Sequence, residues 1–165
     1  MLAMMETELR DFARDVAAPD AFAAFLAGPG AALPDRLGRL AYLTGERPGE
    51  ISRAFGRRLF ERFVSLYPDF VPLSVTALDY LEHIERHVHE EIRALYPEAR
   101  PPRLCCVRLS PTRLLIRYWS ATPAAEMCEG MIEAALAHFE TRAMISRREA
   151  KDAAAVFEVS LVTDD

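Results

Sequence analysis

Histidine is the residue type whose spacing could do chemistry in this chain. Three of its four histidines, His83, His87 and His89, fall within one stretch of seven residues, and the fourth is His138. A neutral imidazole is the commonest metal ligand in proteins. On a helix, His83 and His87 would stand one turn apart and could chelate zinc, but no third ligand follows at a suitable spacing. The residues alone therefore leave open which histidine, if any, binds a metal.

The cysteines predict neither a disulfide framework nor a zinc site. Cys105, Cys106 and Cys128 are odd in number and lack the C-x-x-C spacing, which fits a reducing compartment. We expect them to be small buried hydrophobic residues, with a redox role for the adjacent pair as the alternative. The sequence also shows no nucleophile–base pairing, phosphate loop or paired carboxylates, so we do not expect an enzyme.

The element that must position the histidines is a long helix predicted over residues 76–96. Its apolar residues recur with heptad-type spacing. On this helix His83 points to solvent, whereas His87 and His89 flank the apolar stripe on opposite sides. Pro97 and the Pro101-Pro102 pair end the helix and impose an extended connection. The stripe consists of Leu81, Ile84, Val88, Ile92 and Leu95.

The remaining pattern predicts a single α+β domain. The first half reads as helices over 6–16, 21–26, 35–43 and from Pro48 to Pro68. The period then changes to that of strands, at 104–109, 113–119, 143–147 and 156–162. Between the second and third strands a helix begins at Thr122 as N-cap and Pro123 as first residue, and runs to about Thr141. We expect a helical subdomain over 1–68 and a helix-on-antiparallel-sheet subdomain over 69–165.

Charge and hydropathy exclude several partners. The net charge of −5 argues against nucleic acid or an anionic membrane surface. No apolar run approaches the roughly 20 residues that a membrane span needs. The first residues turn acidic too soon for a secretory signal. The expected location is therefore cytoplasmic.

Several stretches resemble one known family, the haem nitric-oxide/oxygen-binding (H-NOX) proteins. The similarity covers Ile51 to Phe139. It is carried by Ala-Phe-Gly-Arg-Arg-Leu-Phe at 54–60, Leu-Tyr-Pro-Asp-Phe at 66–70 and Gly-Met-Ile-Glu at 130–133. It is also carried by the run from Val88 to Pro102.

The spacing of single residues adds to this resemblance. The family pattern has a proximal histidine, a proline thirteen residues later, and then Tyr-x-Ser-x-Arg. Here Pro102 follows His89 by 13 residues, Tyr118 follows His89 by 29, and Ser120 occupies the serine position. This spacing, rather than helix geometry, selects His89 over His87.

The resemblance implies that haem b lies between the two subdomains. His89 would be the metal ligand, bound to the iron through a neutral imidazole nitrogen. Pro102 would press against the macrocycle and distort it. Tyr118 and Ser120 lie two residues apart on a strand, so their hydroxyls point the same way and would bind the haem propionates.

On the opposite side of the haem, the resemblance implies an apolar pocket. The matching distal positions are Leu59 and Met127, with Phe63 and Met131 completing the wall. Because a hydrogen-bond donor is what holds dioxygen, we expect nitric oxide and carbon monoxide to be preferred over dioxygen. The chain would then be a nitric oxide sensor that signals in trans to a histidine kinase or a cyclic-dinucleotide enzyme.

The sequence departs from the family in three places. Thr122 replaces the arginine of Tyr-x-Ser-x-Arg, which weakens the expected haem affinity because threonine cannot clamp a carboxylate. Residues 1–45 are shorter than the family's first helices, and the cysteine-rich C-terminal zinc site has no counterpart. The alternative interpretation is a haem-free or haem-poor interaction or small-ligand-binding module on the same scaffold.

Overall fold

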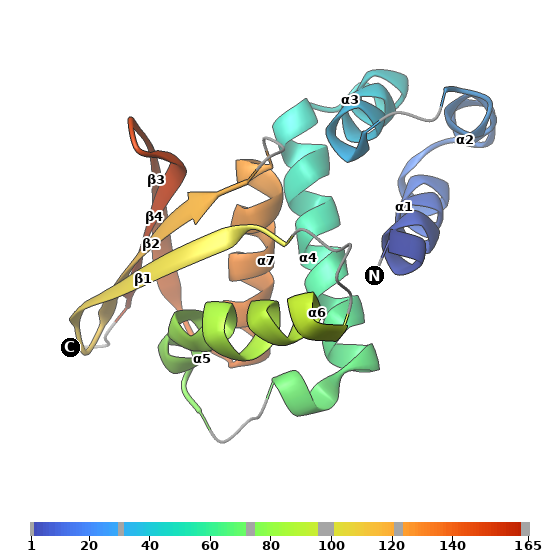
Figure 1. The fold of residues 1–165 in the computed structure, drawn as a ribbon. Helices are drawn as coiled ribbons and strands as arrows, with labels where there is room; N and C mark the ends of the chain where they lie inside the picture. Colours follow the sequence, from blue (N-terminus) through green and yellow to red (C-terminus); the bar gives the residue numbers. More distant parts are fainter. Residues whose placement is uncertain (1, 30–31, 72–74, 96–100, 121–123, 163–165) are drawn as a thin grey trace.

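The computed structural model describes residues 2–29, 32–71, 75–95, 101–120 and 124–162. Its element order is helices first and a sheet later, which confirms the predicted α+β class (Figure 1). The helices before the sheet are α1 (Leu2–Val16), α2 (Pro19–Leu26), α3 (Leu33–Thr44), α4 (Pro48–Leu66), the 3₁₀ turn η1 (Pro68–Phe70), α5 (Ala77–Ile84), the π-helical turn η2 (Glu85–His89) and α6 (Glu90–Leu95). The remaining elements are β1 (Arg103–Ser110), β2 (Arg113–Trp119), α7 (Ala125–His138), β3 (Ala143–Ala150) and β4 (Ala153–Leu161).

The four strands form one antiparallel sheet in the order β1-β2-β4-β3. Alternate residues of β2 and β4 turn toward the helices and are buried, because side chains along a strand point to opposite faces. These inner residues are Leu114, Ile116 and Tyr118 on β2 and Ala155, Phe157 and Val159 on β4. They pack against α5 and α7, while the outer face leaves Val107 and Leu109 exposed on β1.

The predicted helix over residues 76–96 is present but is not uniform. Thr76 caps α5 in a reciprocal capping box with Asp79, which satisfies backbone donors of the first turn. The helix then passes through the π-helical turn η2 before continuing as α6. A π-helical turn holds one extra residue and is common at functional sites. The apolar stripe could not show it, because such a turn changes the local register rather than the residue types.

Other predicted bounds shift by a few residues. Helix α1 begins at Leu2 rather than residue 6, and β4 begins at Ala153 rather than 156. Helix α7 ends at His138, before the predicted Thr141, and Glu140 in the following turn takes a positive φ of 49°. The predicted cap at Thr122 and Pro123 lies outside the described residues.

Two hydrophobic cores meet on α4. The part of α4 up to Leu59 packs with α1, α2 and α3, and includes Ile51, Phe55 and Leu59. The remainder, with Phe60 and Phe63, belongs to the core that α5, α7 and the sheet share. The division of the chain at residues 68 and 69 stays a prediction, but the cores themselves divide within α4.

Helices α4 and α7 touch backbone to backbone. A Cβ added to Gly56 would lie 2.1 Å from the carbonyl oxygen of Met127, and one added to Gly130 would lie 2.0 Å from that of Arg53. Only glycine permits this approach. The pair is further tied by Arg53 to Glu129 at 2.9 Å and by Arg57 to Glu133 at 2.6 Å. The α4–α7 pair is therefore the fixed frame against which the other elements are placed.

Candidate functional site

A cavity of about 520 Å³ lies where the two cores meet. Its size falls within the range of about 300–1,000 Å³ that is usual for small-molecule and cofactor sites. Apolar side chains from α3, α4, α5, α6 and α7 make most of its wall. All eight residues predicted as a site line this one cavity: Leu59, Phe63, His89, Pro102, Tyr118, Ser120, Met127 and Met131. Their individual roles stay predictions.

His89 is the histidine that reaches the cavity. It ends the π-helical turn η2, and its side chain is only 12% exposed. Its Nδ1 lies 3.1 Å from Oε2 of Glu85, which leaves Nε2 as the nitrogen that a metal would take. Burial lowers the pKa of His89, while hydrogen bonds with Glu85 and the Pro102 backbone oppose this shift. A lowered pKa keeps the imidazole neutral, which is the form that ligates a metal.

The other two histidines of this helix stay outside the cavity. His83 and His87 are exposed, and their ring centroids lie 5.5 Å apart. Nδ1 of His83 lies 2.7 Å from the backbone oxygen of Asp79. Among the residues that the structure describes, no group of three or more His, Cys, Asp or Glu side chains could hold a metal ion. A metal that is carried by a cofactor needs only one ligand from the protein, and His89 lines the cavity where it could supply that ligand.

Glu85 is the site residue that the sequence analysis missed. Its carboxylate accepts from Nδ1 of His89, from the backbone N of Leu104 at 2.9 Å and from Nη2 of Arg93 at 2.8 Å. Burial raises the pKa of Glu85, but these hydrogen bonds outweigh it and the net shift is downward, so the group is a carboxylate. The sequence feature that could have indicated Glu85 is an acidic residue four positions before His89 on the same helix.

Tyr118 and Ser120 place hydroxyls at one end of the cavity. Tyr118 is 2% exposed, its ring meets Phe157 edge to face, and its hydroxyl hydrogen-bonds with Ser120. Burial raises the pKa of Tyr118 to about 12, so its hydroxyl stays protonated and can donate. Arg117, which precedes Tyr118 on the strand, pairs with Asp152 at 2.8 Å. Thr122 lies outside the described residues.

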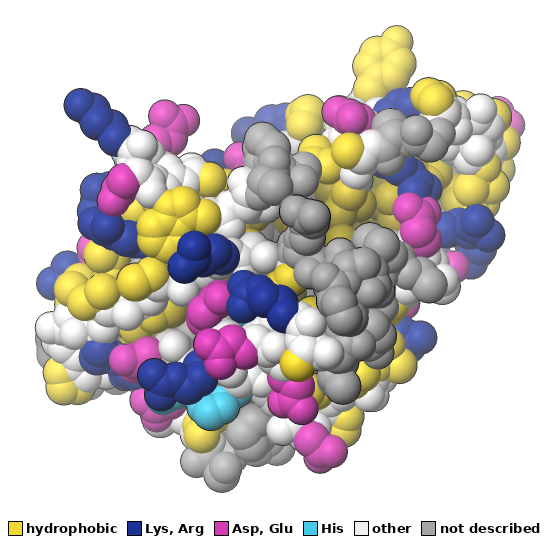
Figure 2. All heavy atoms as spheres, in the orientation of Figure 1, with side chains coloured by type: hydrophobic (Ala, Val, Ile, Leu, Met, Phe, Trp, Pro, Cys, Tyr) yellow, Lys and Arg dark blue, Asp and Glu magenta, His cyan; other side chains and the backbone are white. Residues whose placement is uncertain are grey.

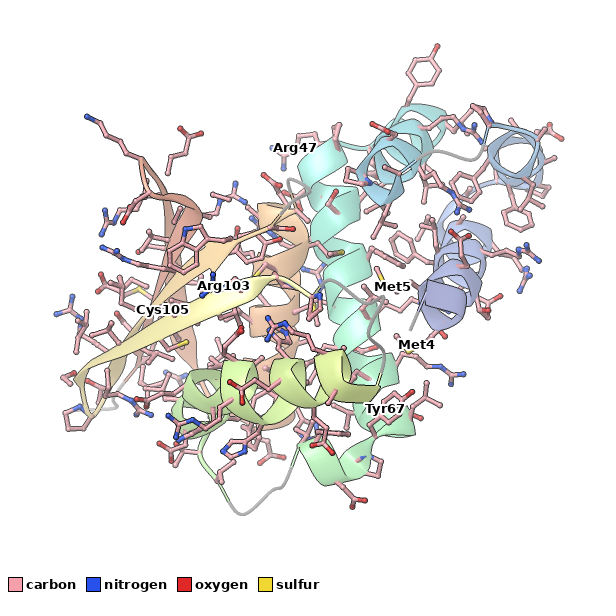
Figure 3. All side chains as sticks on the ribbon, in the orientation of Figure 1. Met4, Met5, Arg47, Tyr67, Arg103 and Cys105 are labelled. Carbon is pink, nitrogen blue, oxygen red and sulfur yellow. The ribbon has the colours of Figure 1, made fainter. Side chains whose placement is uncertain are left out.

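The predicted distal residues form an apolar wall. Leu59 and Phe63 on α4 are 5% and 9% exposed, and Met127 and Met131 face them from α7. The amino-terminal helices, which the sequence pattern could not place, complete this side. Met4 and Met5 of α1 lie against α4 (Figure 3), and they line the cavity together with Leu33, Pro34 and Leu37 of α3.

The residues present fit a haem group. A nearly buried neutral imidazole stands in the wall with a carboxylate behind it, two hydroxyls line the same cavity and could bind a cofactor's acid groups, and the opposite wall is mostly apolar. The surface over this wall is different. Arginine and acidic side chains alternate over the α5–η2–α6 helix (Figure 2). Glu85 is an exception, because its carboxylate turns toward His89.

Comparison with known proteins points the same way. The family model described as Haem-NO-binding matches residues 29–147, which is more than half of the chain. No curated protein matches the sequence. Among solved structures, the Fe(II) unliganded H-NOX protein from K. algicida superposes with a TM-score of 0.87 at 18% identity, covering 98% of this chain and 96% of that one.

Two further solved structures extend this comparison. The H-NOX protein from S. oneidensis in the Fe(II)NO ligation state gives a TM-score of 0.84 at 20% identity, covering 97% and 98% of the two chains. A mutant of the H-NOX protein from T. tengcongensis gives 0.77 at 16% identity, covering 98% and 97%. At these identities the structures show a shared fold. Membership of the family rests on the match to its sequence model.

Proposed function

We propose, from the premise that the chain belongs to the Haem-NO-binding family, that it is a haem-based nitric oxide sensor. Members of this family are haem-binding gas sensors. The observation that carries the proposal for this chain is His89. It is a neutral, nearly buried imidazole whose Nδ1 is held by Glu85 in the wall of an apolar cavity.

Each side of the cavity has its own task in this proposal. The haem, as haem b, would supply an iron that binds diatomic gases. His89 would ligate that iron, Pro102 would press on the macrocycle, and the hydroxyls of Tyr118 and Ser120 would donate to the propionates. Each of these residues lines the cavity, which supports these roles.

The choice of gas follows from the distal wall. Bound dioxygen gathers negative charge and needs a donor, whereas nitric oxide and carbon monoxide do not. Leu59, Phe63, Met127 and Met131 carry no hydroxyl or amide. We therefore expect nitric oxide to be the physiological ligand, with carbon monoxide also bound and dioxygen bound weakly.

The signal would leave through the amino-terminal helices. His89 would loosen its bond to the iron when nitric oxide binds, and α1 to α3 would shift against the rest of the domain. These helices share a core with the part of α4 up to Leu59 and reach the cavity through Met4 and Met5. A histidine kinase or a cyclic-dinucleotide enzyme would read the new surface in trans.

The setting of the sensor is also part of the proposal. We place it in the cytoplasm, acting without catalysis of its own and without nucleic acid or membrane as a partner. The described cysteines are free, which is compatible with a reducing compartment. In the part of the chain that the structure covers, no helix is long and apolar enough to cross a bilayer.

A haem-free interaction module on the same scaffold is the second candidate. Thr122 favours it, because losing a charged partner for a propionate costs on the order of 1.5–3 kcal/mol, or about 10- to 100-fold in affinity. A colourless protein that still binds its partner would establish this candidate.

A visible spectrum of the purified chain after haem loading decides between the two. For the Fe(II) protein, the sensor predicts a Soret band that shifts when nitric oxide is added and changes little when dioxygen is added. A chain that takes up no haem under these conditions would contradict the proposed function.

A further inference from the structure

Glu85 joins three elements through one carboxylate. Its Oε2 accepts two hydrogen bonds, from Nδ1 of His89 at 3.1 Å and from the backbone N–H of Leu104 at 2.9 Å. Its other oxygen, Oε1, accepts a hydrogen bond from Nη2 of Arg93 at 2.8 Å. The π-helical turn, the start of β1 and helix α6 therefore meet at this group.

The position of the carboxylate does not depend on the histidine ring. Leu104 N–H and Arg93 would hold it in place even if the ring rotated. Glu85 is only about a quarter exposed, with 27% of its side chain open to solvent, so water competes weakly for these bonds. The ring of His89 is thus fitted to a fixed acceptor, and its own side chain is 12% exposed.

This arrangement has two chemical consequences for the ring. An acceptor at Nδ1 keeps the proton on that nitrogen, so the lone pair is on Nε2. A charged acceptor also increases the basicity of the imidazole, as carboxylates behind metal-bound histidines do. Arg93 acts in the opposite direction, because its cation withdraws charge from the same carboxylate.

We propose that Glu85 is a positioning residue for the iron ligand: it fixes the orientation and tautomer of His89 and strengthens the bond from Nε2 to iron, with Arg93 moderating this effect. The inference rests on the proposed function. Glu85 would thereby set how readily nitric oxide releases His89, a property that the apolar distal wall cannot control.

The test uses the haem-loaded full chain and three variants. Glu85→Gln keeps the side-chain size but removes the charge, and Arg93→Gln removes the cation that moderates Glu85. Glu91→Gln is the matched control, because it makes the same charge change on α6 at an exposed residue. Resonance Raman spectroscopy of the Fe(II) protein measures the iron–imidazole stretching band. Stopped-flow spectroscopy with nitric oxide measures the rate at which His89 is released.

The two variants should move these readouts in opposite directions. For Glu85→Gln we expect a lower stretching frequency and a release of His89 that is faster by on the order of tenfold, the lower end of the usual effect of such partners. For Arg93→Gln we expect a higher frequency and slower release. Glu91→Gln should match the wild type in both.

A purely structural role would give a different pattern. If Glu85 only tied β1 to the helix, removing either partner would loosen the site, and both variants would shift the band in the same direction. That result, or an unchanged band in Glu85→Gln, would overturn the inference. If Glu85→Gln does not fold, as far-UV circular dichroism would show, the sign of the Arg93→Gln shift decides alone. A wild-type chain without a Soret band would instead overturn the proposed function.

Discussion

The two walls of the cavity are held in place by different physics. On the proximal side, His89 is fixed by hydrogen bonds that run through Glu85 to Arg93 and to the backbone of Leu104. On the distal side, α4 and α7 meet backbone to backbone at Gly56 and Gly130, and most of their side chains that line the cavity are apolar. Changes of charge should therefore act on the proximal wall, and changes of volume on the distal wall.

The most direct way to break the proximal wall is to remove its imidazole. We expect His89→Ala to abolish most haem retention, because no other histidine lines the described cavity wall. His87→Ala is the matched control two residues away on the exposed face. The measurement is the Soret absorbance per mole of protein after haem loading. Equal retention by the two variants would show that His89 is not the residue that holds the haem.

The distal wall should instead be disrupted by a substitution that adds volume between α4 and α7. Gly130→Ala would place a Cβ about where the carbonyl oxygen of Arg53 already lies, since an ideal Cβ would be 2.0 Å from it. We expect a loss of about 3 kcal/mol in the free energy of unfolding, because backbone cannot move aside as a side chain can.

Gly38→Ala is the matched control for that substitution. A Cβ on Gly38, inside α3, meets nothing within 4 Å, so the variant should gain about 0.5–1 kcal/mol from helix propensity. Urea unfolding of both variants gives the comparison. A loss of under about 1 kcal/mol in Gly130→Ala would show that the two helices can separate without cost.

The sequence predicted the helical first half, the strands and the gathering of eight residues around one cavity. Family spacing selected His89, Pro102, Tyr118 and Ser120 without any knowledge of packing, because it only counts residues, and their roles stay predictions. Family spacing could not predict that the amino-terminal helices line the cavity. Met4 and Met5 reach the cavity only through the packing of α1 on α4, and such long-range helix contacts leave no period in the sequence.

The proximal wall shows a second limit of sequence reasoning. The π-helical turn at Glu85–His89 and the bond from Leu104 depend on where β1 begins relative to the helix. An acidic residue four positions before a histidine is common on exposed helices, where it is worth little. Only the burial of His89 and the backbone partner of the carboxylate distinguish Glu85 from such a pair.

A smaller effect would sharpen the comparison on the distal side. Met127→Gln keeps the side-chain length and adds an amide donor to the apolar wall. We expect dioxygen affinity of the loaded Fe(II) protein to rise by up to about tenfold, the equivalent of one neutral hydrogen bond. Met144→Gln, on an exposed residue of β3, is the control and should change nothing. Oxygen titration followed by visible absorption measures both. Weaker or equal dioxygen binding in Met127→Gln would place Met127 away from the gas.

The smallest expected effect lies at the start of the proximal helix. Asp79 accepts from Thr76 in the capping box and from Arg108 of β1 at 2.8 Å. The bond from Thr76 is the largest cause of a lowered pKa for Asp79, and Arg108 adds to it. Because the pKa is lower in the folded state, Asp79 contributes stability above its ordinary value of 3.8, and this is lost as the pH falls through the lowered value.

Asp79→Asn should therefore cost about 0.5–1 kcal/mol at pH 7, a modest amount because Asp79 is half-exposed. The difference from the wild type should shrink as the pH falls below 3.8 and through the lowered pKa of the folded state, where the native carboxylate also becomes neutral. Asp69→Asn, at an exposed residue of η1, makes the same substitution outside the capping box and is the matched control. A difference that stays constant between pH 7 and pH 3 would mean that Asp79 stabilises α5 by shape rather than by charge. Charge would then not be what holds the proximal helix to the sheet.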